Sequence, residues 1–474
     1  MNINPEHYFV LNSGRVLKDL NELVNELKVM DKKTFEYHVN DSKNDFSNWI
    51  AHVFKARKLA ESISGTSYKD INMIRNLIQK YLNELKILII NGGSSSIKFQ
   101  LLEFHSKTIL AKGNIDAIGL DRCTINITFN EELISKKVDV KNSQEASNLV
   151  IQNLIDNGII GDVSEIKAVG HRVVHGGEKY IEPTIIDINI LNELNELSQL
   201  APLHNPANIS YIQAFMKIFN CPHVAVFDTA FHSTISKEKF LYGLPYEYYE
   251  KYKIRKYGFH GSSHKYLSEL LHEYYKIKGR KNPKIIICHL GNGSSITAIK
   301  NYKSFNTSMG FTPLDGLMMG TRCGSLDPAV ALHLENILKI GYEEMGKILN
   351  KKSGLLGISG QSDMRDLYKT RIDPKSKLAM DMFADRLTHY IGAYIAELNG
   401  VDAIVFTAGI GENAHYIRKS VLDNFKYLGL KLNNRQNRKN EFIITDKSSK
   451  ITVFVIPTNE ELEIAMETKK VLKL

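Results

Sequence analysis

The sequence predicts an α/β protein in which two similar domains face each other across a central cleft, preceded by a small all-α module. Three observations lead to this prediction. From residue 86 onward, apolar strand-like runs alternate with helical segments. The pattern KILIINGGSSSIKFQL at Lys86 returns as KIIICHLGNGSSITAIK at Lys284, which indicates a duplication. Residues 1–85 instead carry apolar residues at helical spacing.

The composition is that of a globular protein, with 474 residues of which 43% are hydrophobic and 24% charged. No apolar run approaches the roughly 18 residues of a membrane span, and no basic stretch leads into an apolar block, so we expect neither a membrane partner nor a secretory signal. The four cysteines are widely spaced, which favours a reducing, cytoplasmic location. The net charge of +9 is scattered and often balanced by nearby acids, so we expect no nucleic-acid partner.

The first 85 residues form a helical module with its own core. Three stripes at helical spacing predict its helices: Leu17, Leu20, Val24 and Leu27; Phe46, Trp49, Ile50, Val53 and Phe54; and Ile71, Ile74, Ile78 and Leu82. His38 and His52 also lie here, but a single histidine on such a helix more often packs or faces solvent than binds a ligand. We assign the module no activity and leave open a partner of unknown kind.

Beyond residue 86, apolar runs predict the strands of the two domains. They are Lys86–Ile90, Ile166–Val169, His223–Phe227, Lys284–Cys288, Ala403–Phe406 and Thr452–Ile456. Most of these runs end in a loop rich in glycine, asparagine or aspartate. In open α/β sheets, binding sites gather at such strand ends, so we expect the site there.

The turn NGGSSS after the first strand is a candidate phosphate-binding turn. It is not a Walker loop, because no Gly-Lys-Ser/Thr follows and the next element is a strand. Its glycines allow backbone amides to approach an oxyanion, the hydroxyls of Ser94 and Ser96 add donors, and Lys98 adds a positive charge. Taken alone, the turn fits a simple hairpin equally well.

Further motifs decide between these two interpretations. They are GHRVVHGGE (170–178), LAPLHNPANI (200–209), VFDTAFH (226–232), RKYGFHGSSHKY (255–266), HLGNGSS (289–295), TSMGFTPLDGLMMGTR (307–322), SGLLGISG (353–360), FTAGIGEN (406–413) and PTNEE (457–461). In this order they closely resemble the acetate kinase family, and the resemblance covers almost all of residues 86–474.

The resemblance implies a duplicated ribonuclease-H-like fold of the actin and Hsp70 type. We expect a first kinase domain at residues 86–230, completed by the C-terminal segment 461–474, and a second at residues 231–460. The implied activity is reversible transfer of the γ-phosphoryl of ATP to acetate, with Mg²⁺ or alternatively Mn²⁺. A homodimer is also expected, and residues 1–85 are absent from ordinary members of the family.

The resemblance assigns the metal to Asn91 and Glu460, whose oxygens suit a hard cation. It assigns the nucleotide to Lys98, to two glycine-rich loops and to the stretch that lines the nucleoside pocket. These three segments are His289, Leu290, Gly291, Asn292 and Gly293; Gly409, Ile410, Gly411, Glu412 and Asn413; and Asp363, Met364 and Arg365. The last segment follows Gln361 and Ser362 directly and is one residue shorter than usual, so it leaves the choice of phosphate donor open.

By the same resemblance, Arg172 binds the substrate carboxylate, a task that suits a planar bidentate donor. His260 and Arg322 stabilise the transferring phosphoryl group, and His204 lies near its path. We expect magnesium, both arginines and His260 to supply positive charge there. Asp228 matches a residue usually described as a catalytic acid or base. Because a carboxylate substrate is already ionised, we expect Asp228 instead to order magnesium or its waters.

Four positions match the family's acyl pocket: Val174, Leu203, Phe259 and Pro313. They predict a preference for a short acid, with propionate a poorer substrate than acetate. Gly92 stands where the family usually has alanine, a change expected to be mild. The alternatives are a propionate kinase, a pyrophosphate-dependent kinase, and a nucleotide-gated interaction protein like actin or Hsp70. The last would not need Arg172, His204, His260 and Arg322 together.

Overall fold

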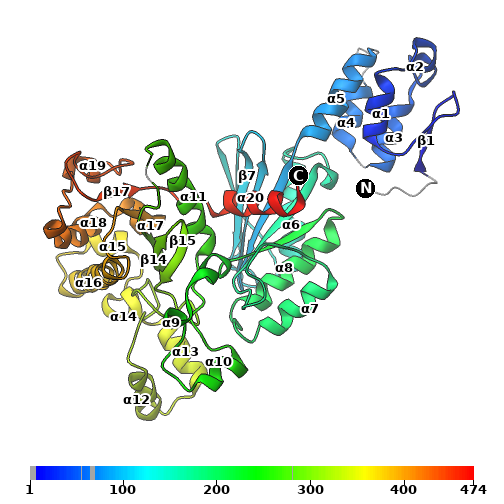
Figure 1. Cartoon of the computed structure of the whole chain (residues 1–474). Coiled ribbons are helices and arrows are strands. Elements are labelled where there is room, and N and C mark those ends of the chain that lie inside the picture. Colours follow the sequence, from blue (N-terminus) through cyan, green and yellow to red (C-terminus); the bar gives the residue numbers. More distant parts are fainter. Residues whose placement is uncertain (1–6, 55, 65–69, 280) are drawn as a thin grey trace.

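The computed structural model describes residues 7–54, 56–64, 70–279 and 281–474. Two α/β domains lie side by side, and a separate N-terminal module projects from the edge of the first (Figure 1). Residues 1–6, 55 and 65–69 of the predicted module lie outside the described residues. In the described part of the chain, no helix is long and apolar enough to cross a membrane. The predicted fold class, a helical module followed by a duplicated α/β pair, is confirmed.

The module contains five helices. They are α1 (Leu20–Leu27), α2 (Lys32–His38), α3 (Asp45–Val53), α4 (Arg57–Ser64) and α5 (Ile71–Asn83). Four of them begin at Asp19, Asp31, Asn44 or Asp70, whose side chain accepts a hydrogen bond from a backbone N–H of the first turn. Their apolar stripes meet in one core that includes Leu23, Phe46, Ile50, Ile74 and Ile78.

The module is not purely helical. Two short hairpins pair β1 (Phe9–Val10) with β2 (Val16–Leu17) and β3 (Val39–Asn40) with β4 (Lys43–Asn44). Two-residue strands are too short to show alternation, and Leu17, placed in a helical stripe from its spacing, lies in one of them. His38 is structural, since its Nε2 accepts from the Asn12 amide (3.1 Å) and its Nδ1 lies 3.0 Å from Asp45 Oδ2.

The first domain is built on an eight-stranded sheet of order β11-β12-β10-β5-β6-β7-β8-β9. The strands are β5 (Lys86–Gly92), β6 (Ser96–Glu103), β7 (Thr108–Asp116), β8 (Thr124–Phe129), β9 (Glu132–Lys137), β10 (Ile166–Val173), β11 (Thr184–Ile185) and β12 (His223–Phe227). Helices α6 (Ser143–Asp156), α7 (Ile188–Leu197) and α8 (Asn205–Ile218) pack against it.

The second domain repeats the central part of this topology. Its sheet has the order β15-β14-β13-β16-β17, which mirrors β7-β6-β5-β10-β12 strand for strand. The strands are β13 (Ile285–Leu290), β14 (Ser294–Lys300), β15 (Lys303–Thr307), β16 (Ala403–Thr407) and β17 (Thr452–Val455). Strand β5 pairs antiparallel with β6 and parallel with β10. In the same way, β13 pairs antiparallel with β14 and parallel with β16. The duplication predicted from the two turn motifs is therefore confirmed.

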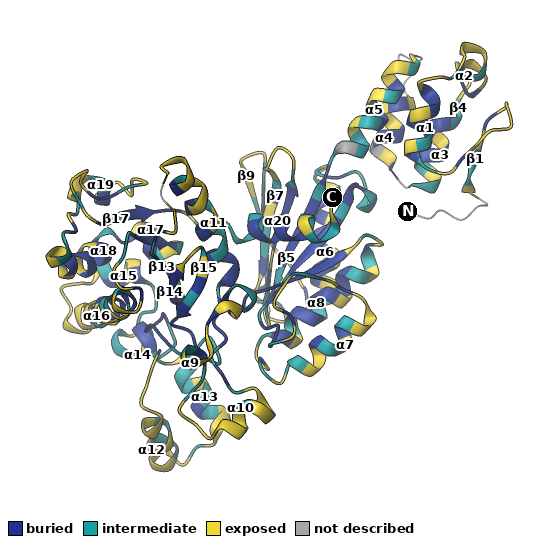
Figure 2. Ribbon diagram, viewed as in Figure 1, coloured by how far each residue is buried: buried dark blue, intermediate teal, exposed yellow. Residues whose placement is uncertain are grey.

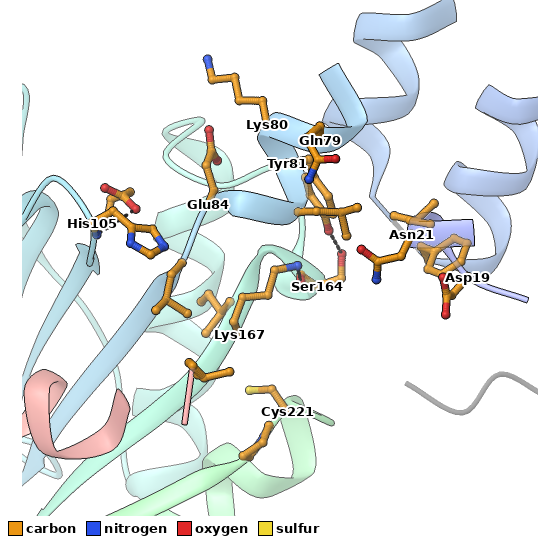
Figure 3. A pocket seen from close by; sticks show the side chains of 18 of the residues that line it. Asp19, Asn21, Gln79, Lys80, Tyr81, Glu84, His105, Ser164, Lys167 and Cys221 are labelled. Atoms are coloured by element: carbon orange, nitrogen blue, oxygen red, sulfur yellow. Dashed lines mark hydrogen bonds between the residues drawn. The ribbon is translucent and has the colours of Figure 1, made fainter. Parts of the chain in front are cut away.

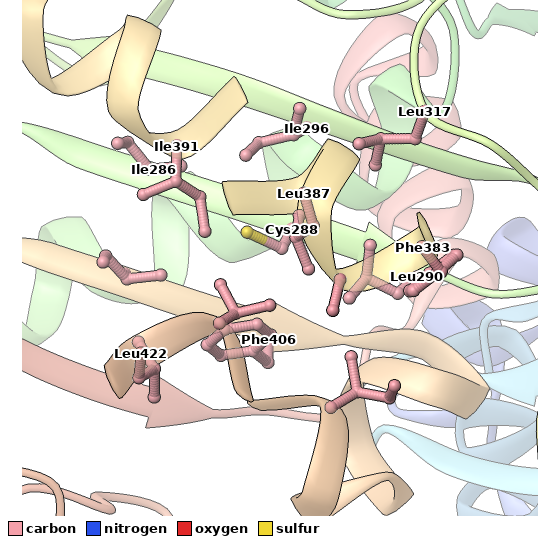
Figure 4. Close-up of a cluster of buried hydrophobic side chains, with 14 of the residues drawn as sticks. Ile286, Cys288, Leu290, Ile296, Leu317, Phe383, Leu387, Ile391, Phe406 and Leu422 are labelled. Carbon is pink, nitrogen blue, oxygen red and sulfur yellow. The ribbon is translucent and has the colours of Figure 1, made fainter. Parts of the chain in front are cut away.

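Helices complete the second domain. They are α9 (Lys237–Phe240), α10 (Tyr246–Tyr252), α11 (Gly261–Ile277), α12 (Pro328–Leu338), α13 (Tyr342–Lys351), α14 (Gly354–Ser359), α15 (Met364–Lys369), α16 (Pro374–Glu397), α17 (Ala408–Asn413), α18 (His415–Leu422) and α19 (Asn434–Arg438). The core of this domain lies between the sheet and α16, where Ile286, Cys288 and Phe406 contact Phe383 and Leu387 (Figure 4). The strands are buried and the outward helix faces exposed (Figure 2).

Two helices join the domains. The C-terminal helix α20 (Glu460–Leu472) packs on the first sheet, where Ile464 and Ala465 contact its buried strands (Figure 1). It is also tied to α11 of the second domain, because Lys265 forms ion pairs with Glu463 (3.0 Å) and Glu467 (2.5 Å). Both helices begin beside the cleft, so this contact lies close behind it.

The module meets the first domain at the amino end of β5. The Arg57 amide donates to Asp162 Oδ2 (2.9 Å), the Tyr81 hydroxyl lies 3.2 Å from Ser164 Oγ, and Lys167 Nζ lies 4.3 Å from the centre of the Tyr81 ring. A cavity of about 1600 Å³ opens between the two parts (Figure 3). Side chains of both charges and apolar side chains line it, so its lining does not indicate one ligand class.

The separate core predicts that residues 1–84 fold when expressed alone. In this fragment Phe46→Ala should lower the free energy of unfolding by about 3–5 kcal/mol, because it removes a fully buried ring. The matched control is Val29→Ala, which is 73% exposed and should change stability by less than about 0.5 kcal/mol. Urea unfolding followed by circular dichroism measures both; a fragment without a cooperative transition would contradict an independent core.

Candidate active site

A cavity of about 260 Å³ lies between the two domains, where the carboxyl ends of β5, β10 and β12 meet loops of the second domain. It is lined by Asn91, Gly92, Gly93, Arg172, Val174, His204, Asn208, Asp228, Phe259, His260, Gly293, Pro313 and Arg322. Most of the residues predicted to bind substrate or to act in catalysis therefore come together here. Leu203 and Glu460 are absent from this lining.

Strand pairing explains how Arg172 and Asp228 meet. Strands β10 and β12 are parallel neighbours in which Val173 lies opposite Phe227. Asp228 follows β12 directly, and its amide donates to the Val173 carbonyl (3.0 Å). Residues at the carboxyl ends of adjacent parallel strands share one edge of the sheet, so these two side chains are placed side by side.

Arg172 and Asp228 form a bidentate ion pair. Arg172 Nε donates to Asp228 Oδ1 (2.9 Å) and Nη2 donates to Oδ2 (2.5 Å). Burial alone would lower the pKa of Arg172, but the charges of Asp228 and Glu460 outweigh it and raise the pKa. Asp228 is only 1% exposed, so the pair is a buried one in which each charge needs the other.

This pairing restricts what Arg172 can offer a substrate. The resemblance assigns its planar fork to the substrate carboxylate, yet in this structure Asp228 takes both Nε and Nη2. A substrate therefore meets the remaining Nη1 edge, unless Asp228 releases the fork. Both carboxylate oxygens of Asp228 are likewise occupied, because each accepts a hydrogen bond from the guanidinium.

The acidic groups beside Arg172 fit a cation. Glu460 Oε2 lies 3.9 Å from Arg172 Nε, and burial followed by the neighbouring Asp228 charge raises the pKa of Glu460, although Arg172 opposes this. Asn91 lies at the end of β5, opposite Lys98 of β6. Among the described residues no group of three or more His, Cys, Asp or Glu could hold a metal ion. One carboxylate, one amide oxygen and water are the ligands expected for a weakly held Mg²⁺.

Arg322 is the second cation at the cavity. Its Nη1 donates to the Pro313 carbonyl (3.1 Å), and burial lowers its pKa. It forms no ion pair with a carboxylate among the described residues. A side-chain carbon added at Gly293 would lie 3.5 Å from Arg322 Nη1 and 3.4 Å from His260 Nε2, so both nitrogens lie close to Gly293. All three residues line the cavity, which brings a positive charge and a ring nitrogen to the same part of its wall.

His260 is held in an uncommon backbone conformation at the start of α11, with φ 56°. Its ring stacks on His289 (centroids 4.3 Å apart), and its Nδ1 lies 2.9 Å from Ser295 Oγ. Burial, with the nearby His289 and Arg172, holds the pKa of His260 well below its usual range. The lowered pKa favours a neutral ring that offers an N–H, whereas the sequence analysis expects His260 to supply positive charge.

Three of the four residues predicted for the acyl pocket line the cavity. They are Val174, Phe259 and Pro313, and Phe259 packs on the buried side chains of Met309 and Met319. Leu203 does not line the cavity, since its side chain is 64% exposed in the turn before α8. The neighbouring His204 does line the cavity, and burial followed by Arg322 lowers its pKa.

Of the residues predicted to bind nucleotide, only Gly293 lines this cavity. His289 and Leu290 end β13, and Gly291 and Asn292 form the turn to β14. Residues 409–413 form helix α17 rather than a loop. Asp363 caps α15 and pairs with Arg365 (2.6 Å), while Met364 is buried. Lys98 is exposed on β6, and Ser94 and Ser96 lie in or at the hairpin turn, where the Ser96 carbonyl accepts from the Gly93 amide (2.7 Å).

Asn208 was not singled out from the sequence, although it lies in the motif LAPLHNPANI. Its Oδ1 accepts from the Val174 amide (3.0 Å) and its Nδ2 donates to the Gly92 carbonyl (2.5 Å). It therefore joins the NGG turn to the loop after β10. The signal available in the sequence was an asparagine on the buried face of a helix, since such a group needs partners.

These features define a class of protein. Two duplicated α/β domains enclose a cavity lined by Arg172, Arg322, two histidines and the carboxylate of Asp228, an arrangement typical of a two-domain phosphotransferase. The profile of the acetokinase family matches residues 86–466. The chain is 51% identical over 398 residues to acetate kinase of Thermoanaerobacterium thermosaccharolyticum, covering 82% of this chain and 99% of that protein. It therefore belongs to the acetate kinase family.

Other relatives agree. Acetate kinase of Carboxydothermus hydrogenoformans is 49% identical over 392 residues, covering 81% of this chain and 98% of that protein. Among solved structures, a propionate kinase from Francisella tularensis superposes with a TM-score of 0.77 at 41% identity, covering 81% of this chain and 99% of that chain. Acetate kinase from Porphyromonas gingivalis gives a TM-score of 0.77 at 38% identity, covering 82% and 100%.

The N-terminal module matches a second family. The profile of a family of unknown function (DUF5752) matches residues 3–108. The match includes α1 to α5 and continues through β5 and β6 of the first domain. The match relates the module to this family but assigns no activity to it.

Gly92→Ala should not be mild, contrary to the expectation from the sequence. An alanine Cβ at this position would lie 2.1 Å from Tyr211 Cδ2, and Tyr211 is buried, so the ring or strand must shift. We expect a loss of about 1–3 kcal/mol in the free energy of unfolding. Gly93→Ala is the matched control, because its Cβ would meet nothing closer than 3.5 Å. Thermal melts of both variants test this, and equal melting temperatures would contradict it.

Proposed function

We propose that this protein catalyses the reversible, magnesium-dependent transfer of the γ-phosphoryl group of ATP to acetate. The observation that carries this proposal is that Arg322 and His260 lie together beside Gly293 on the wall of a small cavity, which is also lined by the apolar side chains of Val174, Phe259 and Pro313. An anionic phosphoryl group fits the first feature and a short acyl group fits the second.

The nucleophile needs no general base. Acetate is ionised at neutral pH, so its oxygen can attack phosphorus directly and in line. Asp228 has no proton to take in this reaction; it holds Arg172 by two hydrogen bonds and lies beside the proposed cation site. Arg172 binds the acetate carboxylate through its free edge, which orients the attacking oxygen.

Arg322 and His260 act on the group being transferred. In a loose phosphoryl-transfer transition state, charge is spread over the three equatorial oxygens. Arg322 supplies a positive charge without a carboxylate to neutralise it, and His260 supplies a neutral N–H. Since neither group must reorganise as the charge develops, the site is arranged for the transition state.

The cation and the nucleotide occupy the remaining predicted positions. Magnesium, when bound, neutralises phosphate oxygens; Asn91 and Glu460 would hold it with water completing the shell. Lys98, His289 to Gly293 and Gly409 to Asn413 are proposed to bind the nucleotide. Asp363, Met364 and Arg365 are proposed to line the nucleoside pocket, and the Asp363–Arg365 pair limits what Arg365 can offer a base.

Propionate is a second candidate substrate because a propionate kinase is among the similar structures. One extra methylene changes discrimination by about 1–3 kcal/mol in a hydrophobic pocket. Met309 and Met319 lie behind Phe259, and flexible methionines accommodate changes in shape. We therefore expect propionate to be used more weakly than acetate.

A hydroxylamine assay for acetyl phosphate tests the proposal directly. Purified protein with Mg²⁺, ATP and acetate should form acetyl phosphate, and ADP with acetyl phosphate should return ATP. Parallel reactions with propionate, GTP and pyrophosphate separate the alternatives. Absence of product in both directions would refute the proposal.

A chain that begins at Glu84 should keep kcat within a few-fold, because the module meets the opposite end of β5 from Asn91.

The two arginines should differ in their kinetics. Arg322→Ala should lower kcat by about 10³–10⁵-fold, as arginines at a transferring phosphoryl do elsewhere. Arg172→Ala should raise the acetate KM substantially and also lower stability, because it leaves Asp228 buried without a partner. Arg322→Lys should rescue little, since lysine lacks the planar fork.

Steady-state kinetics with thermal melts distinguish these effects. The double variant Arg172→Ala/Asp228→Ala is the control for the buried charge, and it should be more stable than Arg172→Ala alone. Near-normal kcat in Arg322→Ala would contradict its assigned role.

A further inference from the structure

A relay of buried side chains stands behind His260. Ser295 Oγ lies 2.9 Å from His260 Nδ1 and 2.7 Å from His264 Nε2. Ser295 and His264 are fully buried, on β14 and α11, and neither lines the cavity. His260 is the residue that precedes α11 and His264 lies in the first turn of that helix; their two rings share one hydroxyl group.

The shared hydroxyl limits the proton positions. A serine hydroxyl has one proton to donate and can accept two hydrogen bonds. Ser295 Oγ has no third hydrogen-bond partner among the described residues, so its proton goes to one of the two rings. The other ring then donates to the oxygen. Either His264 donates and His260 accepts, or the reverse.

The far side of His264 decides between the two arrangements. Its Nδ1 is buried and has no hydrogen-bond partner among the described residues. If His264 accepted at Nε2, its proton would sit at Nδ1 as an orphaned buried N–H, which is rare and costly. If it donates from Nε2, Nδ1 carries only a lone pair. The second arrangement therefore has the lower cost.

We propose that Ser295 and His264 are positioning residues that hold the single proton of neutral His260 on Nε2, facing the phosphoryl site. This proposal rests on the proposed function for its catalytic meaning. The proton sequence is His264 Nε2–H to Ser295 Oγ, and Ser295 O–H to His260 Nδ1. His260 Nε2–H is then the ring N–H left for the cavity that His260 lines together with Arg322.

The chemical consequence is a hydrogen-bond donor that gives up no proton. A neutral imidazole N–H can polarise an oxygen while keeping its proton, as a neutral histidine does in other enzymes. The reverse arrangement would aim the lone pair of Nε2 at phosphate oxygens, which repel it. The stack of His260 on His289 fixes the ring plane, so the relay needs only to fix the tautomer.

The first test determines the tautomer of His260 by a measurement that does not require turnover. Protein labelled with ¹⁵N-histidine should show His260 protonated at Nε2 and bare at Nδ1, with its signals assigned by their loss in His260→Asn. Because this measurement needs no catalysis, it stands even if acetate kinase activity fails. A proton on Nδ1 of His260 in the natural protein would overturn the proposal.

The second test uses variants of the relay. Ser295→Ala should lower kcat about tenfold to a hundredfold, less than the loss of a direct oxyanion donor, with both KM values nearly unchanged. His264→Gln keeps an N–H donor and should retain most of kcat, whereas His264→Leu should lose it. His272→Gln, exposed on the same helix, is the control and should behave as the natural protein.

Folding and tautomer are checked in every variant. Melting curves identify a variant that fails to fold, in which case the His264→Gln and tautomer measurements decide. In folded Ser295→Ala, His260 should show a mixture of tautomers or a proton on Nδ1. Unchanged kcat together with an unchanged tautomer would overturn the proposal.

Discussion

The site depends on one buried ion pair, Arg172 with Asp228. Because Asp228 is almost fully buried, it requires the guanidinium, and removal of either partner would leave an uncompensated charge. Asp228 also accepts a backbone hydrogen bond from Gly261 (3.0 Å), the first residue of α11, and no side chain at Gly261 would fit there. One aspartate thus fixes the substrate arginine from the first domain and places His260 from the second.

Positive charge at the cavity comes from arginine alone. The histidines around it, His204, His260, His264 and His289, all have pKa values lowered chiefly by burial. A buried imidazole that gained a proton would add an unpaired charge beside two arginines. The fold therefore uses histidine for directed hydrogen bonds and arginine for charge.

The sequence predicted the six apolar strands and the duplication, because these depend on local periodicity and on contiguous motifs, but it did not predict β7, β8, β9, β11 and β15. It did not predict features that depend on contacts between distant segments. The Gly92 site is tight because of Tyr211, more than a hundred residues away, and Leu203 faces solvent although its neighbour His204 faces the cavity. Likewise, hydrogen bonds to Asp228 and Ser295 decide which nitrogens of Arg172 and His260 remain free to bind a substrate. These hydrogen bonds cannot be predicted from the spacing of residues along the chain.

The position of the N-terminal module has a mechanical consequence. It is attached through α5 to the amino end of β5, and Asn91 lies about 17 Å away along that strand. Strand β5 is hydrogen-bonded on both sides, to β10 and β6, so it cannot slide without breaking both ladders. A force applied to the module is therefore distributed over the hydrogen bonds of the sheet and displaces Asn91, the residue assigned to the metal, very little. The site and the module are therefore mechanically separated by a strand that two ladders hold in place.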